Sequence, residues 1–197
     1  MLFGFIGSPC SGKTTTAVAV FSMLKNMGFA CELVLEQARL YIANLRYQQN
    51  LDPEEPVILT DSDQIRIMEK QNQIEKTLIK SCGPSVIIVS DSSSLNSLAY
   101  MSAECRDSEI VQKLIPNALK NYTFSFYSTP IQSPAKAPKQ FDPNRIHDES
   151  SSKNIDLTLL ELLQKIEPKI PYSLTSGSIH QRSQFVLSEI INRALTC

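Results

Sequence analysis

The sequence has only two histidines and no Cys-x-x-C pair, so it lacks the ligand spacing of the common protein metal sites. His147 and His180 stand alone, and we expect neither of them to bind a metal. The five cysteines are odd in number, which favours free thiols in a reducing cytoplasm. These absences argue against a disulfide-stabilised scaffold and against a histidine- or cysteine-based metal centre.

Long apolar runs are also absent. No segment approaches the ~20 apolar residues that span a bilayer, so we expect no membrane anchor. The chain enters a short apolar run directly after Met1, without a basic leader or a small-residue cleavage site, so no secretory signal is expected. Together these features favour a cytoplasmic protein.

Neither sign of charge is in excess, since 19 Lys and Arg face 20 Asp and Glu for a net charge of -1. This balance argues against a broad electrostatic surface for nucleic acid, although it leaves room for a local basic cleft. The length of 197 residues and the hydrophobic content of 42% fit one globular domain over residues 1–197.

Strand-like and helix-like patterns alternate along the chain, which predicts an α/β fold: a five-stranded parallel sheet with helices on both faces. The segment 128–153, rich in proline and serine, is predicted to be a lid-like loop. The expected strands are 2–6, 31–35, 86–90, 122–127 and 170–174, and the expected helices are 13–27, 36–49, 61–81, 94–104, 107–120, 154–167 and 178–195.

The segment between the first strand and the first helix matches the pattern G-x-x-x-x-G-K-S/T. Backbone amides of such a loop and the helix N-terminus bind phosphate. Lys13 is expected to reach the β- and γ-phosphates, Thr14 to bind Mg²⁺, and Thr15 to reach the α-phosphate. The predicted nucleotide-binding residues of this P-loop are Gly7, Ser8, Pro9, Cys10, Ser11, Gly12, Lys13, Thr14 and Thr15.

Two carboxylates end predicted strands at the same edge of the sheet. Asp91 follows four β-branched residues, which is the arrangement of a Walker B aspartate that holds Mg²⁺; the alternative is a helix cap. Glu36 ends the second strand, and Arg39 follows one helical turn later. Glu36 is a candidate catalytic base and Arg39 a candidate substrate contact, with a surface ion pair as the alternative.

Three further groups are candidates. Gln64 and Gln71 lie seven residues apart on one predicted helix face and are candidate contacts for an acceptor, or else exposed. Arg145, within the predicted lid, is a candidate for stabilising charge during phosphoryl transfer, or else part of a solvated loop. Gly177 and Arg182 are expected near the nucleotide base, with an exposed position as the alternative for Arg182.

The ordered blocks resemble the small P-loop kinase-like ATPases related to the bacterial nicotinamide-riboside kinase domain, many of which occur in phage genomes. The resemblance implies a nucleoside- or nucleotide-kinase-like sheet, Glu36, Arg39 and Asp91 at the active site, and a lid centred on Arg145. The chain departs from the family in Asp142-Pro-Asn-Arg145, which lacks the family's glycine. The blocks are Gly7–Thr15, Leu33–Ile42, Asp63-Gln64 with Gln71, Val86–Asp91, Phe126–Ile131 leading to Arg145, and Leu174–Gly177 with Arg182.

These features predict a Mg-ATP-dependent phosphotransferase whose acceptor is a hydroxyl of a nucleoside, nucleotide or related ribosyl compound. Two alternatives stay open: a kinase for a hydroxymethylated base in phage DNA, and a partner-dependent ATPase or switch with no small-molecule acceptor. The guanine-reading pattern Asn-Lys-x-Asp is missing, which favours ATP over GTP.

Overall fold

The computed structural model describes residues 1–130, 149–167 and 169–196. Its five strands form one sheet in the order β2-β3-β1-β4-β5, and every neighbouring pair is parallel. The predicted five-stranded parallel sheet is therefore confirmed. The strands are β1 (Leu2–Ile6), β2 (Cys31–Val34), β3 (Ile87–Ser90), β4 (Phe124–Ser128) and β5 (Tyr172–Thr175).

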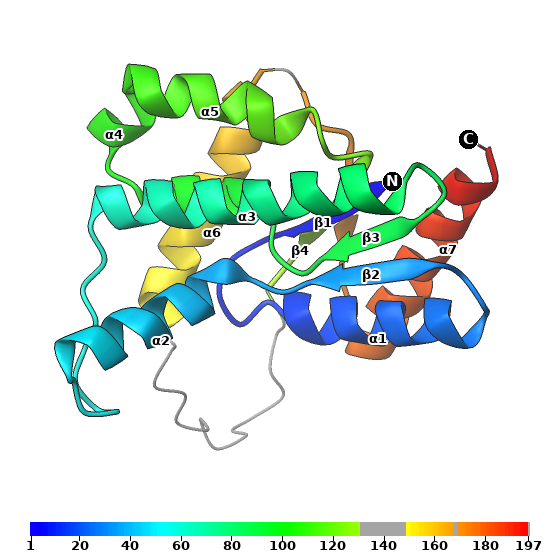
Figure 1. The fold of residues 1–197 in the computed structure, drawn as a ribbon, viewed down its shortest axis with the longest axis horizontal. Coiled ribbons are helices and arrows are strands. Elements are labelled where there is room, and N and C mark those ends of the chain that lie inside the picture. The colour runs from blue at the N-terminus through cyan, green and yellow to red at the C-terminus, as the bar shows by residue number, and fades with distance from the viewer. Residues whose placement is uncertain (131–148, 168, 197) are drawn as a thin grey trace.

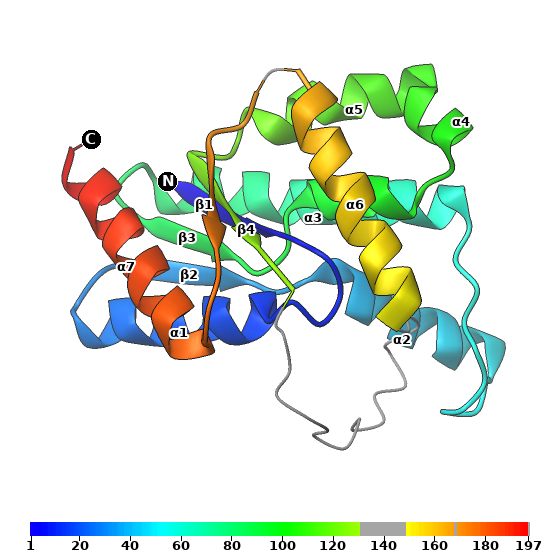
Figure 2. The same ribbon diagram turned by 180° about the vertical axis from the view of Figure 1, so that it is seen from behind.

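Helices cover both faces of this sheet (Figures 1 and 2). On one face lie α1 (Lys13–Asn26) and α7 (Ile179–Thr196). On the other lie α3 (Asp61–Cys82), the 3-10 helix η1 (Ser94–Tyr100), α5 (Glu109–Leu119) and α6 (Glu149–Lys165). The remaining helices are α2 (Gln37–Gln49) and the short α4 (Ala103–Asp107).

Alternation along β1 sends its side chains into two separate cores. Phe3 and Phe5 pack with residues of α1 and α7, and their ring centroids lie 6.5 and 5.6 Å from that of Phe126. Leu2 and Ile6 pack on the opposite face, against α3 and η1. All of β1 is buried, as the central strand of a parallel sheet covered on both sides must be.

The strand order places β1 between β3 and β4, so chain connections run to opposite sides of β1. Ligands of open parallel sheets bind at such a switch point, beyond the carboxyl ends of the strands. The register pairs Gly4 with Ser90, so the segments that leave β1 and β3 emerge side by side. The fold thus brings the loop after Ile6 next to Asp91.

The predicted loop 128–153 is bounded differently in the structure. Ser128 ends β4, and α6 begins at Glu149, so both ends of the predicted loop belong to regular elements. The helix extends upstream because residues 144–167 contain no proline or glycine, and Ile155, Leu159 and Leu163 bury one helical stripe. Residues 131–148 lie outside the described part of the chain.

The segment 94–104, predicted as one helical piece, is divided in two. η1 ends at Tyr100 and α4 starts at Ala103. Serine hydroxyls start both pieces, since Ser93 accepts a hydrogen bond from Leu95 N and Ser102 accepts one from Cys105 N. Because Ser102 caps a new helix shortly after η1 has begun, the predicted helical piece is split into η1 and α4.

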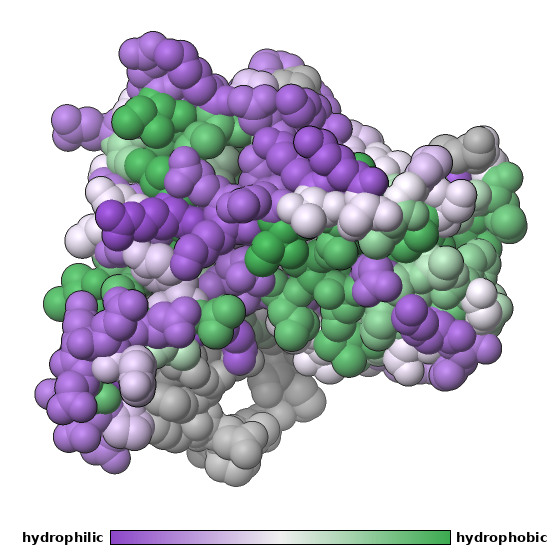
Figure 3. All heavy atoms as spheres, viewed as in Figure 1, coloured by the Kyte–Doolittle hydropathy of each residue, from purple (hydrophilic) through white to green (hydrophobic). Residues whose placement is uncertain are grey.

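β2 forms an edge of the sheet, and Figure 3 shows apolar surface over β2 and α1. Val18 of α1, Met27 just after α1 and Leu35 just after β2 are exposed. Within the described ranges, no helix is both long and apolar enough to cross a membrane.

Candidate functional site

The loop between β1 and α1 has the backbone shape that phosphate binding requires. Gly7 (φ 151°), Cys10 (φ 62°) and Gly12 (φ 82°) have positive φ angles. At Gly7 a Cβ atom would lie 2.7 Å from the carbonyl oxygen of Ser128, so only glycine fits. α1 starts at Lys13 without a side-chain cap, which leaves its first amides available to an anion.

Lys13 lies across this loop. Its Nζ donates to the carbonyl oxygens of Gly7 and Ser8, both at 2.8 Å. The ammonium group is therefore held at the loop, where the sequence pattern places the β- and γ-phosphates.

Asp91 follows β3 and is 2% exposed. Burial, and next the charge of Glu36, raises its pKa to about 6, while a hydrogen bond from the Thr14 side chain favours the charged form. Among the described residues, no group donates to Asp91 Oδ1. A buried carboxylate oxygen left without a donor, next to a threonine hydroxyl, fits a site for Mg²⁺.

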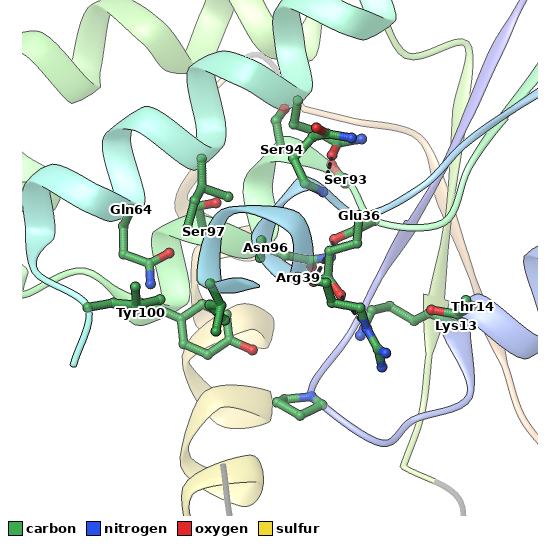
Figure 4. Close-up of a pocket in the computed structure, with 18 of the residues that line it drawn as sticks. Lys13, Thr14, Glu36, Arg39, Gln64, Ser93, Ser94, Asn96, Ser97 and Tyr100 are labelled. Atoms are coloured by element: carbon green, nitrogen blue, oxygen red, sulfur yellow. Dashed lines mark hydrogen bonds and ion pairs between the residues drawn. The ribbon is translucent and has the colours of Figure 1, made fainter. Parts of the chain in front are cut away.

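Glu36 and Arg39 face the P-loop across one pocket. Glu36 is the N-cap residue of α2, and its Oε2 lies 3.8 Å from Arg39 Nε. Ser92 Oγ donates to Glu36 Oε1 at 3.4 Å. Figure 4 shows both side chains beside Lys13 and Thr14. Glu36 and Arg39 therefore form the ion pair that was the alternative to a role in the site, but this ion pair lines the pocket.

The pocket is a cavity of about 130 Å³ that is lined by the P-loop and by residues of α2, α3 and η1. At the end away from Lys13 lie Tyr100 and Gln64, and the pocket is also lined by the apolar side chains of Ile42 and Ile67. Burial raises the pKa of Tyr100, so its ring stays neutral. This end can hold a flat, partly apolar group with hydrogen-bonding edges.

Gln64 and Gln71 are both buried lining residues, so the alternative of an exposed helix face is wrong. The amide of Gln71 is already engaged with the protein. Its Nε2 donates to Glu75 Oε1 at 3.0 Å and to Ser90 Oγ at 2.9 Å, and its Oε1 accepts from Gln37 N at 3.1 Å. Within the described ranges, the side-chain amide of Gln64 makes no hydrogen bond to the protein, so it is available to a ligand in the pocket.

Arg182 lies behind the P-loop and is 2% exposed, so the alternative of an exposed position is wrong. Its Nη1 donates to the carbonyl oxygens of Ser11 at 2.9 Å and Thr129 at 2.8 Å, and its Nε donates to that of Gly177 at 2.8 Å. Arg182 therefore ties the P-loop to the ends of β4 and β5. Its predicted contact with the nucleotide remains a prediction, as does that of Gly177.

Arg145, the predicted charge-stabilising residue of the lid, lies outside the described residues. The structure thus gathers the P-loop, Glu36, Arg39, Gln64, Gln71 and Asp91 at one edge of the sheet, with Arg182 beneath them.

Asn96 of η1 was not a candidate from the sequence. Its Oδ1 accepts from Gly7 N at 3.2 Å, and its Nδ2 donates to Phe5 O at 3.2 Å and to Ser92 Oγ at 2.9 Å. Asn96 therefore fixes the start of the P-loop. It follows a run of serines with no periodic pattern, so only its position just after the strand of Asp91 could have marked it.

A phosphate-binding loop between the central strand and its helix, with a buried aspartate after the neighbouring strand, defines a P-loop nucleoside-triphosphate-binding protein with a kinase-like sheet. The chain belongs to the AAA_28 family, described as AAA domain, whose family model matches residues 2–182. A P-loop of this family binds a nucleoside triphosphate, typically with Mg²⁺. A search of curated protein sequences found no match to this chain.

Solved structures share the fold at low sequence identity. Deoxyadenosine kinase from M. mycoides aligns with a TM-score of 0.57 and 10% identity over 98% of this chain and 99% of its own. Thymidylate kinase from Candida albicans aligns with a TM-score of 0.60 and 16% identity over 98% and 92%. The NadR protein, in complex with NAD and AMP-PNP, aligns with a TM-score of 0.60 and 15% identity over 97% of this chain and 48% of its own.

Replacing Arg182 with alanine is expected to loosen the P-loop. Three carbonyl oxygens would lose a charged donor, which predicts a loss of about 2–3 kcal/mol in the free energy of unfolding and weaker binding of Mg-ATP. Arg182→Lys, which keeps the charge but not the planar fork, should recover only part of both. Urea unfolding and binding of a fluorescent ATP analogue measure the effects; wild-type values for Arg182→Ala would contradict the assignment.

Stability should depend on pH through Glu75. Burial raises its pKa from 4.5 to about 7 in the folded protein, so the unfolded chain ionises first as pH rises. The contribution of Glu75 is fully present below pH 4.5 and is lost as pH rises to about 7. Glu75→Gln removes this titration, so the unfolding free energy of the variant minus that of wild type should increase by about 3 kcal/mol over that range. Urea titrations from acid to neutral pH test this; a constant difference would refute it.

Proposed function

We propose that the chain is a Mg-ATP-dependent phosphotransferase that moves the γ-phosphoryl group of ATP to a hydroxyl of a nucleoside, nucleotide or related ribosyl compound. One observation carries the proposal: a single pocket is lined at one end by Lys13 and Thr14 and at the other by Tyr100 and Gln64, with Glu36 and Arg39 between them. Hydrolysis needs space for a water only, whereas this pocket extends well beyond the phosphate loop.

In this proposal Lys13 and the amides of the P-loop bind the β- and γ-phosphates, while Thr14 and Asp91 would hold Mg²⁺. The metal, when bound, neutralises charge on the phosphate oxygens. Glu36 accepts the proton of the acceptor hydroxyl. The hydroxyl oxygen forms a bond to the γ-phosphorus while the bond between that phosphorus and the bridging β–γ oxygen breaks, so that ADP leaves. Arg39 orients the acceptor beside Glu36, and Arg145 is proposed to stabilise the transferred charge.

The lining of the pocket supports an acceptor with a flat ring. Tyr100 at the far end offers a neutral aromatic ring, Gln64 beside it carries an amide that can pair with the edge of a base, and Ile42 and Ile67 of the lining offer apolar contact. The shared fold with deoxyadenosine kinase, thymidylate kinase and NadR agrees with this class of acceptor. So does the resemblance to the nicotinamide-riboside kinase domain.

The first test is ADP release from Mg·ATP across a panel of acceptors, with Lys13→Ala as the blank. The panel contains nicotinamide riboside, ribo- and deoxynucleosides, their monophosphates, and DNA with and without hydroxymethylated bases. We expect one small-molecule class to raise ADP release and to yield a phosphorylated product. Stimulation by modified DNA alone would identify the acceptor as a base in DNA. A flat panel with slow, Lys13-dependent hydrolysis would overturn the proposal in favour of a partner-dependent ATPase.

Glu36→Gln tests the assignment of the base. The amide keeps the shape of the side chain but cannot take the proton, so transfer to the acceptor should fall by about 10²-fold or more while ATP binding stays near the wild-type value. Glu32→Gln, on the exposed side of β2, is the matched control and should leave transfer unchanged. Full transfer by Glu36→Gln would show that Glu36 is not the base.

A further inference from the structure

A completely buried carboxylate lies beneath the pocket without lining it. Glu75 of α3 is 0% exposed. Its Oε1 accepts from Gln71 Nε2 at 3.0 Å and from Ser90 Oγ at 2.7 Å, and both of its oxygens accept from Tyr122 OH at 2.8 Å. Every group that faces the carboxylate is a donor, as burial of a carboxylate requires.

On one side, Glu75 fixes the orientation of the Gln71 amide. Gln71 Nε2 turns toward acceptors on Glu75 and Ser90, so its Oε1 must point the other way, to Gln37 N at 3.1 Å. In the structure Glu75 Oε1 is an acceptor for both Gln71 Nε2 and Ser90 Oγ, and it therefore selects this one of the two possible orientations of the amide.

The backbone N–H group that donates to Gln71 Oε1 belongs to Gln37, the first residue of α2. Glu36, the N-cap residue, makes no capping hydrogen bond with its own side chain, so Gln71 caps the helix from a neighbouring helix instead. This first turn of α2 carries Glu36 and Arg39, which lie over the P-loop (Figure 4). The position of both side chains thus depends on the amide of Gln71.

On the other side, Glu75 holds the opposite wall of the pocket. Tyr122 OH donates to Glu75 and accepts from Ser94 N at 3.0 Å. The Ser90 hydroxyl shares its one hydrogen between Glu75 Oε1 at 2.7 Å and Ser92 O at 3.0 Å. Ser92 and Ser94 both line the pocket. One carboxylate therefore connects the segment after β3 with the start of α2.

We propose that Glu75 is a positioning residue for phosphoryl transfer: through Gln71 it sets the first turn of α2, and with it Glu36 and Arg39, against the P-loop. This inference rests on the proposed phosphotransferase function for its kinetic consequence, but not for its structural one. It also gives Gln71, a candidate acceptor contact from the sequence, a different role. Gln71 transmits the orientation set by Glu75 to the backbone of α2.

Glu75→Gln is the decisive substitution. It puts an NH₂ group in place of one of the two oxygens, so the side chain at position 75 no longer imposes one orientation on Gln71. When this NH₂ group faces Gln71, the Gln71 amide reverses and presents its Nε2 to Gln37 N, which removes the cap. Gln71→Leu removes the cap directly and should have the same effect. Glu69→Gln, an exposed position on the same helix, is the control.

The structural readout is the hydrogen-exchange rate of the Gln37 amide, measured by NMR on the full chain. We expect exchange about tenfold faster in Glu75→Gln and in Gln71→Leu, the change that loss of one hydrogen bond of typical strength produces, and no change in Glu69→Gln. This readout needs no acceptor, so it stands even if the acceptor panel is flat. An unchanged rate in Glu75→Gln would overturn the inference and leave the proposed function intact.

The kinetic readout uses the acceptor that the panel identifies. Glu75→Gln and Gln71→Leu should each lower kcat for transfer by about tenfold while the KM for Mg-ATP stays within about twofold of wild type. Since both act through one contact, the double variant should be no slower than either single variant. Additive losses, or a loss of ATP binding together with kcat, would indicate a general structural role and refute positioning.

Discussion

The parallel pairing of β1 with β3 is the constraint on which the site depends. The register sets Gly4 beside Ser90, the last residue of β3, so both strands end at the same edge of the sheet, with β1 running on to Ile6. The P-loop leaves one strand and Asp91 leaves the other, at the centre of a sheet whose faces are both covered. A slip of this pairing would turn the side chains of β1 to the wrong cores and separate the phosphate loop from its carboxylate.

Buried polar residues hold this edge of the sheet from behind. Asn96 bonds the amide of Gly7, Arg182 bonds the carbonyl of Ser11, and Glu75 orients Gln71. The side chains of all three residues are buried. A polar group in such a place is costly unless its partners are fixed, so each of them rigidifies the loop or helix that it contacts.

The two halves of the site differ in how they are built. The nucleotide side comes from one continuous segment, Gly7 to Thr15, whose shape follows from its own glycines and from the start of α1. The proposed acceptor side is assembled from α2, α3 and η1, which all contribute walls of the pocket. Under the proposed function, a change of acceptor would therefore require no change in the P-loop.

The sequence by itself determined the alternation of strands and helices, the P-loop and the placement of Glu36 and Asp91 at strand ends, because each is a local pattern with a local cause. Only the tertiary structure decided that Arg182 reaches Ser11, 171 residues away, and that Asn96 reaches Gly7, 89 residues away. It also divided the roles of Gln64 and Gln71, which share a helix face but have different neighbours. Hydrogen bonds between distant segments leave no periodicity in the sequence, because only packing of the elements fixes which polar groups meet.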